Sequence, residues 1–266
     1  MLDVRTRKVA QILTKRYLRN YVIMLVTLLG LSLVANIFKT NGTFYETYAF
    51  LPIGGVTVIM GFFVLYTYPD FKYLIQNGVS RRTYWKGKVW AIVIAGALTR
   101  LLSYLLYFAT QVPFQALSNR ITYLHQLKTD ISDSIFFELF GHASSLSGTH
   151  LGWTIAGMII YGVVLTLEAW LWAMAIGALF SLLTRKAQVV VGIALVVGGN
   201  YLIYLMFVIL IWMVRHQEHM MINLLRYLDQ SVLTSLPYSL LLDGVTAVIA
   251  LLVSYWTFHH LYLRND

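Results

Sequence analysis

The segment of this chain that comes nearest to a known chemical site is Phe71–Lys88, FKYLIQNGVSRRTYWKGK. Its last Gly-Lys pair looks like part of a phosphate-binding loop, in which closely spaced glycines let backbone N–H groups wrap the phosphates. That loop needs its glycines five positions apart and, after the lysine, a Ser or Thr that holds magnesium. Here Gly78 and Gly87 are nine positions apart and Val89 follows Lys88. We therefore expect this chain to bind neither ATP nor magnesium.

Histidines and carboxylates offer no better catalytic pattern. The run RHQEHM places His216 and His219 beside Glu218, but this is neither of the helical zinc-protease arrangements HExxH and HxxEH. No Ser–His–Asp set or carboxylate pair has a recognisable spacing, and the chain has no cysteine. We expect no catalytic residue and no metal site, so the chain is not expected to be an enzyme.

Three ionisable residues within long apolar runs are more informative: Arg100, Glu168 and Asp243. A charge inside a membrane is costly unless it faces protein or water, so such residues mark a pair or a polar path. Arg100 and Glu168 fall near the middle of consecutive apolar segments, which suggests a contact between them, direct or through water. The contact would serve either as a gate in a substrate path or as a lock between two helices. Asp243 would line an outward vestibule or reach the interface.

The elements that must position these residues are membrane helices. Hydrophobic residues make up 59% of the 266 residues and charged residues 12%, whereas a soluble domain is about a quarter charged. Six apolar runs are each long enough, at about 1.5 Å per residue, to cross a core of about 30 Å. They do not alternate in polarity, so they favour helices over a barrel. The six predicted spans are 21–38, 50–68, 89–112, 153–183, 187–214 and 237–262.

The positive residues predict the orientation. The net charge is +9, but the Lys and Arg residues cluster beside apolar runs, which is typical of membrane topology and not of nucleic-acid binding. Fourteen of the twenty would lie on one side, in the N-terminal tail, the segment 69–88, the turn after 183 and the C-terminus. That side should be cytoplasmic, with both termini inside the cell. We expect a multi-pass protein of the cytoplasmic membrane.

Three regions are expected outside the hydrocarbon. Residues 1–20 place Val9, Leu13 and Tyr17 on one helical face and basic residues on another, which predicts an interfacial helix with its apolar face in lipid. The segments 113–152 and 215–236 would be extracellular, the first with one or two short helices. Small residues, among them Gly61 and the pair Ala173 and Gly177, should mark close helix contacts within the chain.

The segment IQNGVSRRTYWKGK, within this arrangement of helices, resembles the permease subunit of bacterial ABC-2-type ABC transporters. Many such permeases from Gram-positive bacteria carry a similar asparagine-glycine-x-serine-arginine run, followed by an aromatic residue and a lysine that enters the third helix. The resemblance in topology covers nearly the whole chain, and the motif covers about fifteen residues.

The resemblance implies a function for the segment 69–88. In that family it holds the coupling helix, which seats in a groove on a separate ATPase subunit that carries the ATP and Mg. Residue types agree: Asn-Gly favours a turn, Ser can cap a following helix, and arginines can meet acidic groups of a soluble partner. The candidate ATPase contacts are Asn77, Gly78, Ser80, Arg81, Arg82 and Tyr84.

The chain is thus expected to be an all-α integral membrane protein without its own ATPase. It would work in export, paired with a second permease copy or a homologous permease and with ABC ATP-binding subunits. The alternative is a membrane protein that acts without ATP: an immunity protein, a membrane enzyme or a secondary transporter. A secondary transporter often has internal repeats, and none is evident between the two halves of this chain.

Overall fold

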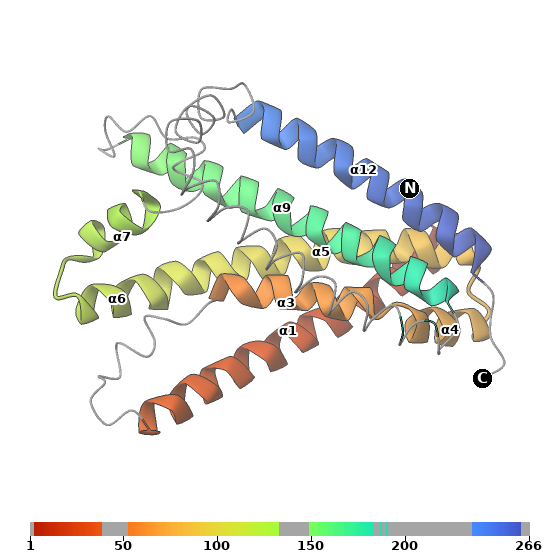
Figure 1. The fold of residues 1–266 in the computed structure, drawn as a ribbon, viewed down its shortest axis with the longest axis horizontal. Coiled ribbons are helices and arrows are strands. Elements are labelled where there is room, and N and C mark those ends of the chain that lie inside the picture. Colours follow the sequence, from red (N-terminus) through yellow and green to blue (C-terminus); the bar gives the residue numbers. More distant parts are fainter. Residues whose placement is uncertain are drawn as a thin grey trace, which may run out of the picture.

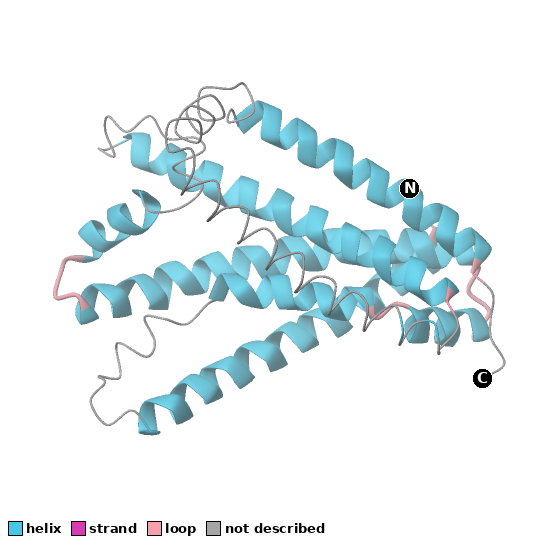
Figure 2. Cartoon of the chain, in the orientation of Figure 1, coloured by secondary structure: helices cyan, strands magenta, loops and turns pink. Residues whose placement is uncertain are grey.

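A computed structural model describes residues 3–38, 53–132, 149–183, 187, 190 and 236–261. These residues form helices joined by short turns, and no strand occurs among them (Figure 2). Figure 1 shows α5 and α9 in the middle of a bundle, with α1 along one side and α12 along the other. The elements are α1 (Val4–Phe38), α3 (Ile53–Leu65), α4 (Tyr68–Gln76), α5 (Arg81–Leu106), the π-helix η1 (Tyr107–Gln111), α6 (Val112–Ser118), α7 (Tyr123–Ser132), α9 (Thr149–Leu182) and α12 (Leu236–His260).

Three stretches of described helix are long and apolar enough to cross a membrane: Arg81–Ser118, Ile155–Leu182 and Leu240–His260. They overlap the predicted spans 89–112, 153–183 and 237–262, so the expectation of an all-helical chain with membrane-spanning helices is confirmed at this level. The number of six crossings and the side of each terminus stay predictions. Residues 21–38 belong to α1, α3 covers only part of 50–68, and 187–214 lies almost entirely outside the described residues.

The N-terminal region differs from its prediction. We expected an interfacial helix over 1–20 and a separate span from 21, but α1 is one continuous helix of 35 residues. The predicted apolar face exists, yet Val9, Leu13 and Tyr17 are each at most 3% exposed because they pack inside the bundle. Its predicted contact with lipid is therefore wrong. Gly87 of α5 leaves room for this packing, because a Cβ atom at that position would lie 2.6 Å from Val9 Cγ1.

A small residue sets the close contact between α3 and α9, as predicted for Gly177. A Cβ atom at Gly61 of α3 would meet Ala173 and Trp170 of α9 at 3.9 Å, an ordinary van der Waals distance. A Cβ atom at Gly177 would lie 2.0 Å from the backbone oxygen of Leu65, so the two helices touch there without an intervening side chain. Trp170 is fully buried at the centre of the core. These contacts hold α3 and α9 together within one chain.

The predicted short helices after residue 112 are present in the described part of 113–152. The span Arg81–Ser118 continues from α5 through η1 into α6, and α7 folds back beside it (Figure 1). The Tyr107 hydroxyl donates a hydrogen bond of 2.7 Å to Asp130 Oδ2 and so ties α7 to η1. The side of the membrane on which this region lies stays a prediction.

Gly177→Ala tests the backbone contact between α9 and α3. The new methyl group has no room against the Leu65 carbonyl, so we expect a loss of about 1–3 kcal/mol in the free energy of unfolding. The measurement is thermal unfolding of the purified chain in detergent. The matched control is Gly152→Ala in the same helix, where a Cβ atom meets nothing within 4 Å. Equal melting temperatures for the two variants would contradict this packing.

Candidate functional site

The segment between α4 and α5 has the predicted turn and cap. Gly78 has φ of +78°, a left-handed conformation that favours glycine. The N–H groups of Gly78 and Val79 donate to the carbonyls of Ile75 and Leu74 at 3.0 and 3.1 Å, which closes α4 with a Schellman motif. Ser80 then caps α5, with its Oγ accepting from the Thr83 N–H at 3.2 Å. We expected the helix that Ser80 caps to be short. The capped helix is instead the 26-residue α5, and the short helix α4 precedes the turn.

Three aromatic rings form the base beneath this turn. The Phe71 ring centroid lies 5.4 Å from that of Tyr84, and the centroids of Tyr84 and Phe258 are 5.3 Å apart. Tyr84 is fully buried, and its hydroxyl donates to the Thr67 carbonyl at 3.4 Å. In this structure the Tyr84 side chain contacts other residues of the chain, and its contact with a partner stays a prediction. Its ring packs against Phe71 of α4 and Phe258 of α12. Tyr84 thus anchors the turn to these two helices.

Lys88 is also part of the interior, although the sequence groups it with the charges of the segment. Its side chain is fully buried. The ammonium group donates to the Val64 carbonyl at 3.1 Å and to Thr67 Oγ1 at 2.6 Å, where α3 ends. The last carbonyls of a helix lack partners within the helix, and Lys88 supplies a donor to one of them. Lys88 thus joins α5 to the end of α3.

An ion pair that sequence analysis missed lies nearby. Arg16 of α1 donates through Nη1 to Oδ1 of Asp70 in the first turn of α4. The Asp70 side chain is 7% exposed and that of Arg16 is 49% exposed. The sequence feature that could have indicated the pair is Asp70, the single acidic residue in the basic segment 69–88. Burial raises the pKa of the adjacent Tyr17 phenol, so its hydroxyl stays neutral beside Arg16.

The remaining residues of the segment divide between an internal contact and an exposed surface. Arg81 Nη1 donates to the His259 carbonyl at 2.9 Å, which ties the start of α5 to the last turn of α12. The next residue, Arg82, is exposed. We define the tip as the exposed residues of the turn and of the first turns of α5: Gln76, Asn77, Gly78, Ser80, Arg82 and Lys86.

The predicted direct Arg100–Glu168 contact is not formed; the ion pair among the described residues is Arg16–Asp70. Arg100 donates to the Tyr104 hydroxyl at 3.0 Å, and its guanidinium lies 4.5 Å from the centroid of that ring. The Tyr104 hydroxyl donates in turn to the Met158 carbonyl of α9 at 2.9 Å. Arg100 therefore takes part in the contact between α5 and α9.

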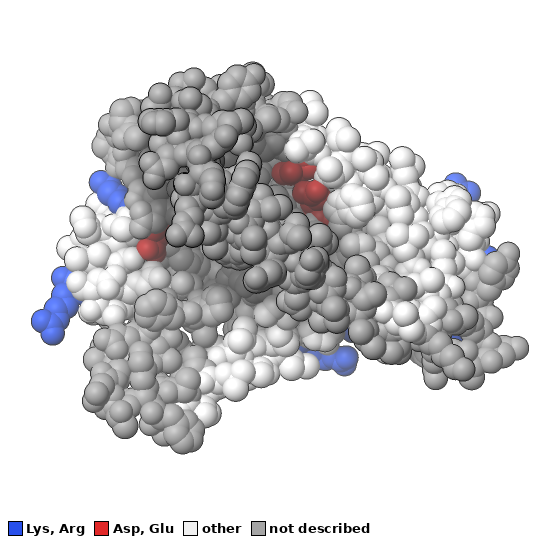
Figure 3. All heavy atoms as spheres, in the orientation of Figure 1, with Lys and Arg blue, Asp and Glu red and all other residues white. Residues whose placement is uncertain are grey.

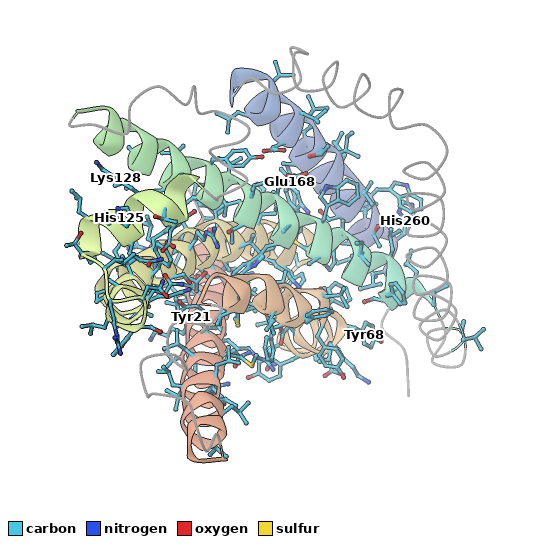
Figure 4. The ribbon with its side chains drawn as sticks, turned by 60° about the vertical axis from the view of Figure 1, so that its left-hand side comes forward. Tyr21, Tyr68, His125, Lys128, Glu168 and His260 are labelled. Atoms are coloured by element: carbon cyan, nitrogen blue, oxygen red, sulfur yellow. The ribbon has the colours of Figure 1, made fainter. Side chains whose placement is uncertain are left out.

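Glu168 faces α12 instead. Its carboxylate accepts a hydrogen bond from the Thr246 hydroxyl, and the nearby Asp243 side chain interacts with it. Figure 4 shows Glu168 between α9 and α12, and acidic side chains form a red patch at the same junction in Figure 3. Two of the three predicted intramembrane residues are thus brought together, and Arg100 is separate from them. Among the described residues, no group of three His, Asp or Glu side chains could hold a metal ion.

Comparison with protein-family models, with curated proteins and with solved structures gives no match to this chain.

The Arg16–Asp70 pair predicts an asymmetry between two single variants. Arg16→Gln leaves a buried carboxylate without its cation, which should cost about 1–3 kcal/mol of unfolding free energy. Asp70→Asn should cost less, because the half-exposed Arg16 can regain water. Thermal unfolding of both variants and of the double variant gives the comparison, and the double variant should recover part of the Arg16→Gln loss. A larger loss for Asp70→Asn would contradict the burial that we describe.

The Gly78 turn predicts a graded series. Gly78→Ala forces a Cβ atom into the left-handed region and should cost about 1–2 kcal/mol. Gly78→Asn should cost less, because asparagine adopts this conformation more readily than alanine does. A Cβ atom at Gly78 meets nothing within 4 Å, so crowding does not confuse the comparison. The measurement is thermal unfolding in detergent, and equal losses for both variants would contradict the positive φ.

Proposed function

We propose that this chain is the membrane-spanning permease subunit of an ATP-driven exporter of the ABC-2 type. The observation that carries the proposal is the tip, an exposed polar turn that stands on a closely packed base. The tip offers amide, hydroxyl and cationic groups at Asn77, Ser80 and Arg82, which suit a soluble protein partner with acidic groups. The partner would be a separate ATP-binding subunit that holds the ATP and Mg.

The contacts around the base support a way to transmit force. The turn is fixed to α12 through Arg81 and Phe258, to α3 through Lys88, and to α1 through Asp70. A displacement of the tip would therefore be transmitted to α1, α3 and α12 together. In the proposed cycle, closure of two ATP-bound subunits pulls on the tips of two permease copies, and their helices open toward the outside.

The polar residues within the bundle fit a substrate path in this proposal. Glu168 and Asp243 lie at the junction of α9 and α12, and both side chains are partly exposed. Arg100 is assigned a role in helix packing and not in the path, because it donates to Tyr104, which contacts α9. The proposed substrate path therefore includes Glu168 and Asp243 at the α9–α12 junction and no longer includes Arg100. The proposal also retains cytoplasmic termini and a location in the cytoplasmic membrane.

Co-purification tests the proposed partner. The tagged chain, solubilised from its native membrane in mild detergent, should bring down a protein that carries a phosphate-binding loop and hydrolyses ATP. Arg82→Glu should reduce the recovered ATPase at least tenfold, or about 1.4 kcal/mol, through charge repulsion at the tip. Lys128→Glu on α7, far from the tip, is the control with the same charge change (Figure 4).

The outcomes separate this proposal from a protein that works without ATP. If no ATPase co-purifies with the wild-type chain, the permease proposal fails. If an ATPase is recovered equally with Arg82→Glu and with wild type, the tip is not its docking site. Thermal unfolding of Arg82→Glu should match that of wild type, because the side chain is exposed, and this excludes misfolding as the cause of a loss.

A further inference from the structure

One strip of α1 stays exposed along most of its length. Spacings of four and three residues place Lys8, Ile12, Lys15 and Arg19 on a single helical face, and Val22 and Val26 continue it. All six residues are exposed. We call this face the outer strip; it is opposite the face that carries Val9, Leu13 and Tyr17, which is buried in the bundle. Arg16 lies beside the strip but is engaged by Asp70.

The outer strip changes character along the helix. Its first half carries three cations, and its second half is apolar, with Val22 52% and Val26 59% exposed. Ile12, 52% exposed, interrupts the cations. A membrane surface has the same order of environments, because anionic head groups border the acyl chains and long cationic side chains can reach the head groups.

We infer that the outer strip binds the anionic head groups of phospholipids, with Lys15 and Arg19 at the phosphates and Val22 and Val26 against the acyl chains. This reverses the usual use of an amphipathic helix, whose apolar face enters the lipid, because that face of α1 packs against α5 and α3. Charge complementarity and continuity with an apolar surface favour lipid over an acidic soluble protein, which would leave Ile12 and Val22 exposed. The inference does not depend on the proposed ATPase partner.

The test measures how lipids stabilise the full-length chain in detergent. Phosphatidylglycerol should raise the melting temperature at lower concentration than phosphatidylcholine does, and added salt should reduce the difference. Each cation near an anionic surface contributes about 1 kcal/mol, so Lys15→Gln/Arg19→Gln should raise the half-maximal phosphatidylglycerol concentration roughly 30-fold. Arg120→Gln/Lys128→Gln, which removes the same charge from the region of α6 and α7 at the far end of the bundle (Figure 1), should leave it unchanged.

A further variant and a soluble phosphate compound distinguish lipid from other ligands. Ile12→Ser keeps every charge and should weaken the phosphatidylglycerol effect several-fold, because a side chain that dips between head groups is lost. Soluble glycerol phosphate should give no stabilisation; a shift equal to that of phosphatidylglycerol would show a phosphate site and overturn the inference. Equal responses to the two lipids, a response insensitive to salt, or an unchanged response of Lys15→Gln/Arg19→Gln would also overturn it. So would loss of a co-purifying acidic protein in that variant without any change in its response to lipid.

Discussion

The buried ammonium group of Lys88 fixes the end of the bundle that carries the tip. Its two hydrogen bonds, to the Val64 carbonyl and the Thr67 hydroxyl, offset part of the cost of taking a polar group out of water. These acceptors lie where α3 ends, so the third turn of α5 lies beside that point. The neighbouring residue Gly87 then lets α1 approach, and Tyr84, one turn earlier, closes the aromatic base. Several helices thus take their relative positions from one polar contact.

Local features of this region were predictable from the sequence because they depend on neighbouring residues. The turn at Gly78 and the cap at Ser80 follow from the residue types alone. The amphipathic pattern of α1 was also evident. What covers its apolar face was not, because that depends on a gap at Gly87, nearly eighty residues away in the chain. The same limit explains why Tyr84 and Lys88 were counted among surface residues.

The intramembrane residues show a second limit. Counting residues placed Arg100 and Glu168 at similar depth, and depth follows from distance along a helix. A contact also requires that both side chains point toward each other. Arg100 packs near Gly162, and Glu168 lies six residues further along α9, which is about one and two-thirds turns and so faces another direction. Partners such as Thr246 come from a helix whose position no local pattern indicates.

The π-helix η1 interrupts the α-helical geometry of the longest helical stretch, Arg81–Ser118. It covers Tyr107–Gln111, and such π turns occur mostly singly inside α-helices and are frequent at functional positions. On one side of it, α5 is clamped along α1, α3 and α9; on the other, α6 contacts mainly α7. The residues Tyr107–Gln111 therefore separate a part of the stretch that is packed into the bundle from a part that is not. Bending there would let the end bearing α6 and α7 swing while the packed part stays in place.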